Sequence, residues 1–143
     1  MKITDAPVVV EQAFAKPIET VWAAITEVDR MRQWFFDNIP DFKPELGFET
    51  RFVVSVEDRS YTHMWKIIEV EAPTLIRYNW HYQEHAGDSN VLFILNEKNG
   101  TTTLQVSTEI LEDFPENVPE FGREQAVAGW TYLIHERLKA LLQ

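Results

Sequence analysis

The residues His81 to His85 spell HYQEH, which matches the H-x-x-E-H pattern of one class of zinc hydrolases. In that pattern a helix projects both histidines from one face and places the glutamate beside them, where zinc activates a water molecule. Here the five residues begin inside an alternating run that is typical of a β-strand. At about 3.3 Å per residue, a strand separates the two histidines by about 13 Å. We therefore predict no zinc site at this motif.

Few other residues suggest catalysis. The chain has no cysteine, which excludes disulfides, thiol catalysis and cysteinyl zinc sites. It has no G-x-S-x-G nucleophile motif, and the acidic residues at the predicted strand ends fit solvent-facing alternation. His63 and His135 are surface or core histidines in the simplest interpretation, and an acid or base in a cavity in the alternative one. The sequence predicts no catalytic residue, no metal and no cofactor.

Composition indicates one globular domain, residues 1–143. The chain has 45% hydrophobic residues, 13% aromatic residues and a mean hydropathy of -0.26. Its formal charge of -10 argues against binding to nucleic acid or to anionic membranes, which both need clustered lysine and arginine. No apolar run approaches the roughly 18 residues needed to span a bilayer, so we expect a cytoplasmic protein with no membrane insertion. Because an exposed strand edge can pair with a second copy of the chain, we expect either a monomer or a weak dimer.

Much of the negative charge lies in one segment, residues 109–124. The simplest interpretation is a solvated loop followed by an acidic first turn of a helix. The alternative is a docking surface for a basic protein partner. The acidic residues concerned are Glu109, Glu112, Asp113, Glu116, Glu120 and Glu124.

Hydrophobic periodicity predicts the order strand, two short helices, five strands and a long helix, which is an α+β fold with a mostly antiparallel sheet. Pro17 begins the first helix, and Asp29 caps a second one that ends at Trp34. Asn99-Gly100 predicts a type I′ hairpin turn between the last two strands. The expected strands are residues 8–16, 48–57, 60–71, 74–83, 90–97 and 101–110.

The last helix is predicted to run from Phe121 to the end of the chain, about 33 Å at 1.5 Å per residue. Its apolar residues form a broad stripe that would cross the sheet. Gly129 lies in the middle of this helix, where glycine costs about 1 kcal/mol relative to alanine. We expect a close backbone approach at Gly129 to explain that cost.

Aromatic residues gather on one face of the strand TLIRYNWHYQ, where Ile76, Tyr78, Trp80 and Tyr82 alternate with polar residues. We expect this face to look toward the long helix. Two interpretations remain open, a solid core or a cavity in which tyrosine hydroxyls and tryptophan N–H groups orient a ligand.

Four segments, in this order, resemble the START-like or SRPBCC superfamily, and within it the family of heat-shock-protein-90 ATPase activator homologues. They are KPIETVWAAITEVDRMRQWF, KIIEVEAPTLIRYNW, the hairpin with NGTTTLQV, and GWTYLIHERLKALL. The resemblance implies a helix-grip fold, with a curved antiparallel six-stranded sheet wrapped around a long C-terminal helix and two short helices after the first strand. It also implies a hydrophobic cavity, ligand binding and a role in the stress response. The chain departs from the family by having only Leu46-Gly47-Phe48 where a Gly-Gly pair is usual.

Three functions follow from this resemblance. The first is a protein that encloses an apolar or aromatic small molecule between the sheet and the C-terminal helix. The second is a partner-binding module related to the chaperone activators, and the third is a cyclase- or hydrolase-like enzyme. In the first function Trp34 and its neighbours form a gate at the mouth of the cavity. The predicted lining consists of Trp22, Trp34, Phe36, Phe52, Val54, Tyr78, Trp80, Tyr82, Phe93, Val106, Val127, Trp130 and Ile134.

Overall fold

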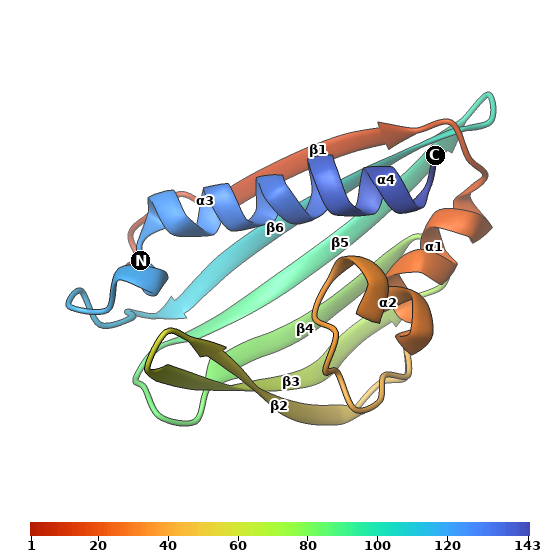
Figure 1. Cartoon of the computed structure of the whole chain (residues 1–143). Helices are drawn as coiled ribbons and strands as arrows, with labels where there is room; N and C mark the ends of the chain where they lie inside the picture. Colours follow the sequence, from red (N-terminus) through yellow and green to blue (C-terminus); the bar gives the residue numbers. More distant parts are fainter.

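A computed structural model describes residues 1–143, and its central feature is one six-stranded antiparallel sheet. The strand order is β1-β6-β5-β4-β3-β2, so the first strand lies at one edge beside the last (Figure 1). The predicted fold class and all six predicted strands are confirmed, with their ends displaced by at most two residues. The strands are β1 (Val8–Phe14), β2 (Glu49–Val56), β3 (Arg59–Glu71), β4 (Leu75–Tyr82), β5 (Asp88–Lys98) and β6 (Thr101–Glu112).

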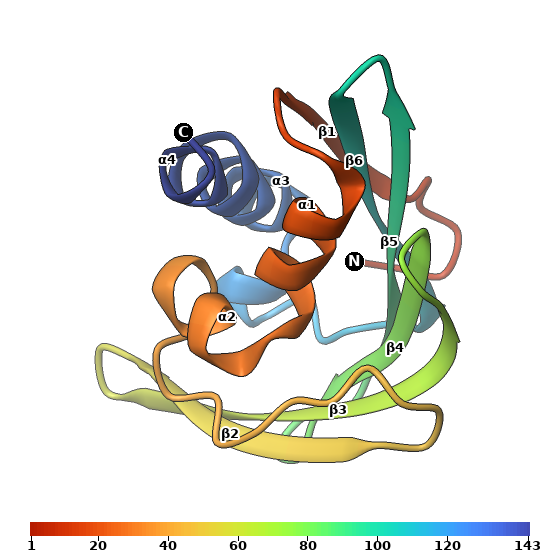
Figure 2. The same cartoon turned by 90° about the vertical axis from the view of Figure 1, so that its right-hand side faces the viewer.

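The sheet is strongly curved, and the helices lie on its concave side (Figure 2). The alternation along β4 explains this arrangement, because its apolar residues Ile76, Tyr78 and Trp80 are buried on the concave face, where the helices cover them. Arg77 lies on the other face and forms ion pairs with Glu69 at 3.0 Å and Glu109 at 3.7 Å. One face of each strand therefore covers the core while the other faces water.

The β5–β6 hairpin has the predicted type I′ turn. Asn99 has a φ of 54° and Gly100 a φ of 78°, as this turn requires of its two central residues. The turn sets the register in which Lys98 lies opposite Thr101, and this register continues along the hairpin as far as Ser89.

Two short helices, α1 (Ile18–Thr26) and α2 (Val28–Trp34), cover one end of the sheet (Figure 1). Pro17 precedes α1, as expected. The prediction that Asp29 caps α2 is wrong, because Glu27 occupies the cap position and α2 begins at Val28. A single residue links the two helices, so the cap falls before Asp29, whose carboxylate instead accepts a hydrogen bond from Arg32 at 3.3 Å.

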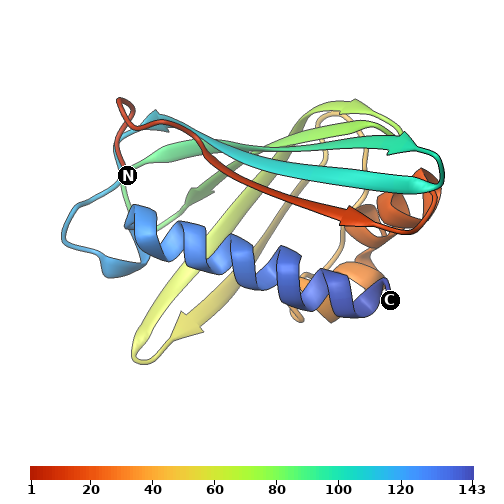
Figure 3. The ribbon, with the colours of Figure 1, turned by 90° about the horizontal axis from the view of Figure 1, so that it is seen from above.

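The C-terminal helix crosses the concave face of the sheet (Figure 3). It begins at Arg123, two residues later than predicted, because Gly122 is extended, with φ -74° and ψ 153°. Phe121 belongs to a separate 3-10 turn, η1 (Pro119–Phe121). The helix continues as α3 (Arg123–Thr131), a wider π-helical stretch η2 (Tyr132–Leu138) and α4 (Lys139–Leu141).

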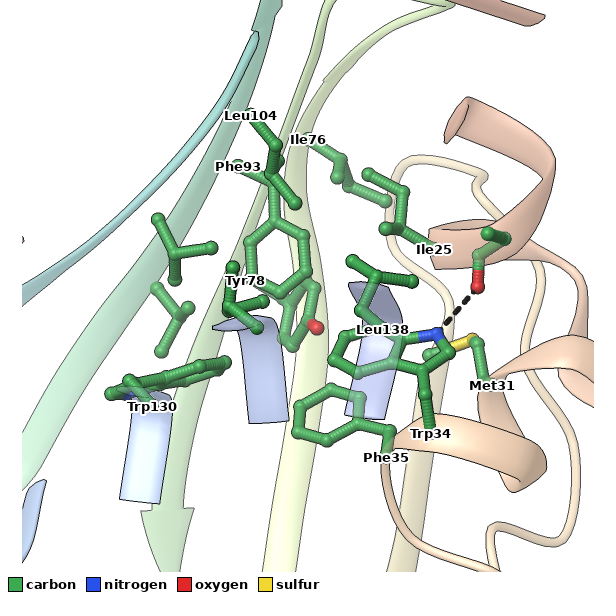
Figure 4. Packing of buried hydrophobic residues seen from close by; sticks show 14 of the residues in the cluster. Ile25, Met31, Trp34, Phe35, Ile76, Tyr78, Phe93, Leu104, Trp130 and Leu138 are labelled. Carbon is green, nitrogen blue, oxygen red and sulfur yellow. Dashed lines mark hydrogen bonds between the residues drawn. The ribbon is translucent and has the colours of Figure 1, made fainter. Parts of the chain in front are cut away.

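One core of 26 buried residues joins the sheet to all the long helical elements. Trp34, Tyr78 and Phe93 have no exposed surface and lie at its centre (Figure 4). Its helical members come from α1, from α2 and from the C-terminal helix from Trp130 onward. The other end of the concave face lies under α3, which is poorer in large apolar residues.

Candidate ligand pocket

A pocket of about 400 Å³ lies between the concave face of the sheet and α3. Hydrophobic residues make up 13 of its 19 lining residues. The volume lies within the range of about 300–1,000 Å³ that is typical of small-molecule sites. Every strand of the sheet except β1 contributes side chains: Val56, His63, Trp80, Tyr82, Ser89, Val91, Thr108 and Ile110.

The helix wall of the pocket is built at helical spacing from Ala126, Gly129, Trp130 and Leu133. The expected close backbone approach at Gly129 is wrong, because a Cβ added there would have no heavy atom within 4 Å. Gly129 instead lies open to the pocket. Its missing side chain leaves space beside the Trp130 indole, which is only 7% exposed.

A second aromatic cluster closes the end of the pocket beyond α3. It consists of Tyr61, Phe114 and Phe121, with Tyr82 packed against it. The rings of Tyr82 and Phe121 stack with their centroids 4.9 Å apart. This cluster is separate from the main core, so the pocket has aromatic walls at this end that do not belong to the filled interior.

The structure places four of the predicted lining residues in the pocket: Phe36, Trp80, Tyr82 and Trp130. Two others, Trp22 and Val54, are partly buried against the core, and Val127 is 40% exposed. The remaining six are buried in the core and do not line the pocket: Trp34, Phe52, Tyr78, Phe93, Val106 and Ile134.

Several pocket residues were missing from the predicted lining, notably Thr108, Ser89 and Gly129. Thr108 follows Leu104 and Val106 at a spacing of two, and Ser89 precedes Val91 and Phe93 in the same way. Extending each alternation by one polar residue would have found both. Gly129 carried a signal as well, because an exposed helical glycine is costly, but a close approach was the wrong explanation for it.

His63 is the most strongly perturbed polar residue of the pocket. Burial lowers the pKa of its imidazole to about 4, although the hydrogen bond to the Tyr61 carbonyl and the charge of Glu84 oppose this shift. The ring is therefore neutral at pH 7. It lies between aromatic neighbours, with centroids 4.8 Å from the Tyr82 ring and 5.1 Å from the Phe52 ring.

The two histidines and the glutamate of HYQEH contact different partners. Glu84 accepts hydrogen bonds from the backbone N–H of Thr62 at 2.8 Å and from its hydroxyl at 2.5 Å. His81 Nδ1 is 2.9 Å from the Asn79 side-chain oxygen, and the His85 ring packs against Phe121. No group of three histidine, aspartate or glutamate residues is arranged to hold a metal ion. The other histidine that we considered, His135, is exposed on η2, and its Nε2 is 2.7 Å from the Glu11 carbonyl.

Much of the acidic segment is engaged within the chain. Glu116 pairs with Lys2 at 2.6 Å, and the Asp113 carboxylate accepts a hydrogen bond from the Ile3 N–H at 2.7 Å. Glu120 pairs with Arg59 and accepts a hydrogen bond from the Tyr61 hydroxyl at 2.8 Å. These contacts tie the segment to the N-terminus and to β3.

The curved sheet, the long helix on its concave face and the two short helices define the START-like helix-grip class of proteins. Within this class the chain belongs to the family described as activator of Hsp90 ATPase homolog 1-like protein, whose model matches residues 15–143. No helix is both long enough and apolar enough to cross a membrane.

Several solved structures are similar to the chain over nearly its whole length. Protein MLL2253 from Mesorhizobium loti is 27% identical, with a TM-score of 0.75, and the match covers 96% of each chain. CV1439 from Chromobacterium violaceum is 16% identical, with a TM-score of 0.78 over 95% of this chain and 96% of that one. DynU16, from the dynemicin biosynthetic locus, is 25% identical with a TM-score of 0.76; the match covers 96% of this chain but only 47% of DynU16. A comparison with curated proteins returns no match.

Proposed function

We propose that the protein binds an apolar or aromatic small molecule in the pocket between the sheet and α3. The observation that carries this proposal is the pocket itself, about 400 Å³ with mainly hydrophobic walls and a few buried polar atoms. A ligand that loses about 300 Å² of apolar surface gains about 7 kcal/mol before the costs of association. A micromolar dissociation constant needs about 8 kcal/mol of net binding free energy, so apolar burial alone gives a weaker complex, and hydrogen bonds to the polar wall atoms have to add to it.

The comparisons support this proposal at a coarse level. DynU16 comes from a biosynthetic locus, a setting in which a protein that holds a small molecule has a use. The chain corresponds to about half of DynU16, so that relation supports the class of function and not a particular ligand.

The test is an amide-shift NMR titration against fatty acids, sterols, flavonoids and aromatic polyketides. We expect saturable shifts at Trp80, Ser89, Thr108 and Gly129, which line the pocket from three strands and the helix. Residues of the filled core near Trp34 should shift less. A flat response across the whole panel would overturn the proposal.

The family description makes activation of the Hsp90 ATPase the second candidate. Its direct test is the ATPase rate of purified Hsp90 with and without this protein, at low and high salt. The contacts of Asp113, Glu116 and Glu120 within the chain weigh against the acidic segment as a docking surface for a basic partner. An increase in the ATPase rate that disappears at high salt would favour this candidate over small-molecule binding.

The third function, a cyclase- or hydrolase-like enzyme, requires an acid or base in the pocket. His63 is the titratable group best placed there, but an imidazole with a pKa of about 4 is a weak base at neutral pH. Its Nδ1 lies against a backbone carbonyl and not against a carboxylate that would support a positive charge. These features suit a fixed hydrogen-bonding group better than a proton-transfer catalyst.

A further inference from the structure

The polar atoms of the pocket define the ligand that it would accept. No lysine or arginine side chain lines the pocket. Its charged lining residues are Glu120 and Met1, whose N-terminal ammonium donates to the Phe121 carbonyl oxygen at 2.7 Å. His63 and Tyr82 line the pocket with hydrogen-bonding capacity that the protein does not use, on Nε2 of His63 and on the hydroxyl proton of Tyr82. Buried polar atoms are normally paired, so atoms left free in a pocket wall indicate where a ligand pairs with them.

His63 presents an acceptor. Its Nδ1 is 3.1 Å from the Tyr61 carbonyl oxygen, which can only accept, so Nδ1 carries the proton. In a neutral imidazole the other nitrogen, Nε2, then has a free lone pair. Nε2 has no hydrogen-bond partner in the protein, and the ring forms part of the pocket wall.

Tyr82 presents a donor. Thr108 Oγ1 on β6 also has no partner, but it is sealed from the pocket and is therefore out of reach of a ligand there. The Tyr82 hydroxyl accepts a hydrogen bond from Trp80 Nε1 at 3.1 Å, which leaves its own proton free. Burial raises the pKa of Tyr82 to about 12, so the hydroxyl keeps that proton at neutral pH. The Ser89 hydroxyl, in contrast, is already used, because it donates to the Trp80 carbonyl at 2.6 Å.

The pocket is unfavourable for anions. An ionised carboxylate loses several kcal/mol of hydration on burial unless a cation or several donors replace it. Here the N-terminal ammonium of Met1 is the one cation among the lining residues, and it already donates to the Phe121 carbonyl. The Glu120 carboxylate, which Arg59 and Tyr61 hold, adds a negative charge that opposes it. The aromatic rings of Phe36, Trp80 and Trp130 favour flat ring systems over flexible chains.

We infer that the pocket selects uncharged, flat polycyclic ligands that carry a hydroxyl or N–H donor for His63 and a carbonyl acceptor for Tyr82. Ligands that owe their polarity to a carboxylate, such as fatty acids, bind poorly. This inference rests on the proposed function, because it names the class of molecule that the same pocket takes.

The test uses three probes with one ring system: fluorenone, its 2-hydroxy derivative and its 2-carboxylate. All three share the flat rings and the ketone, and they differ only in the added group. Titrations followed by amide shifts should give the hydroxy derivative an affinity about tenfold above that of fluorenone, the effect of one added hydrogen bond. The carboxylate should bind at least about tenfold more weakly than fluorenone.

Two variants assign the preference to residues. His63→Phe should retain fluorenone binding but reduce the hydroxyl preference to less than about twofold. The matched control is His81→Phe on β4, because His81 does not line this pocket and the preference should persist. Tyr82→Phe keeps the ring and removes the donor, so it should weaken all ketone probes severalfold.

The outcomes separate the inference from the proposed function. Equal binding of fluorenone and its hydroxy derivative, tight binding of the carboxylate, or an intact preference in His63→Phe would overturn the inference and leave ligand binding in place. If none of the three probes binds and the wider panel also gives no shifts, the proposed function fails, and the inference fails with it.

Discussion

Trp34 Nε1 donates a hydrogen bond to the Ala24 carbonyl oxygen at 2.7 Å, inside a core where the indole has no exposed surface (Figure 4). The bond joins α2 to α1 from the inside. The indole also stacks on Phe35, with ring centroids 4.6 Å apart. Trp34 therefore holds the two short helices to each other and to the core.

From this contact we expect Trp34→Ala to lower the free energy of unfolding by about 3–5 kcal/mol, the usual cost of deleting a buried tryptophan. Trp34→Phe keeps much of the packing and loses the hydrogen bond, so its cost should be about 1–2 kcal/mol. Urea denaturation measures both. Probe affinity of Trp34→Phe should equal that of the wild type. A large loss of affinity at unchanged stability would instead support the gate inferred from the sequence.

Gly129 gives a direct test of the pocket. Gly129→Leu should weaken probe binding at least about tenfold, because the new side chain extends into the space that the ligand needs. Stability should not fall, since leucine favours a helix by about 0.5–1 kcal/mol over glycine. Ala128→Leu is the matched control, because Ala128 is exposed one residue earlier and does not line the pocket. Unchanged affinity in Gly129→Leu would place the ligand elsewhere.

The strands could be predicted from the sequence because alternation with a period of two is a local property, and the sheet satisfies it along β4. The hairpin at Asn99-Gly100 was equally local, because two adjacent residues determine the turn. The pocket is not a local property. Tyr78 and Trp80 lie on the same face of β4 two residues apart, yet Tyr78 is sealed in the core and Trp80 lines the pocket.

What separates these two residues is the element that packs opposite each of them. Trp34 and its neighbours from α1 and α2 fill one end of the concave face, while Gly129 leaves the other end open. No periodicity in the sequence records which strand position meets which helix. The π-helical stretch η2 could not be predicted from the sequence either, because its apolar residues have the spacing of an ordinary α-helix.

His63 should make stability depend on pH. Its pKa falls from 6.5 in the unfolded chain to about 4 in the fold, so the unfolded state binds the extra proton between these values. The stabilisation is complete above pH 6.5 and is lost as the pH falls through 4. Between pH 7 and 4.5 we expect a loss of about 2–3 kcal/mol from this residue.

Urea denaturation of the wild type and of His63→Phe at both pH values isolates this contribution, because the acidic residues that also titrate are common to both proteins. The wild type should lose about 2–3 kcal/mol more than the variant. Equal losses would mean that His63 titrates normally in the fold, and would remove the argument for a permanently neutral imidazole in the pocket.

Gly87, in the loop between β4 and β5, lies beside the pocket wall. It has a φ of +108°, and a Cβ added there would lie 2.6 Å from Cγ of Phe114, a ring that lines the pocket. We expect Gly87→Ala to cost about 3 kcal/mol or more, because backbone strain and the displaced ring both contribute. Probe affinity should fall together with stability.

Gly100→Ala is the control for backbone strain. Gly100 also has a positive φ, +78°, but an added Cβ meets nothing within 4 Å, so only the strain of about 1 kcal/mol should appear. Probe affinity should not change, because Gly100 lies in the β5–β6 turn and does not line the pocket. Thermal unfolding and probe titration of both variants compare the two effects. If Gly87→Ala were no more costly than Gly100→Ala, the Phe114 ring would have room to move, and the end wall of the pocket would adapt to its ligand.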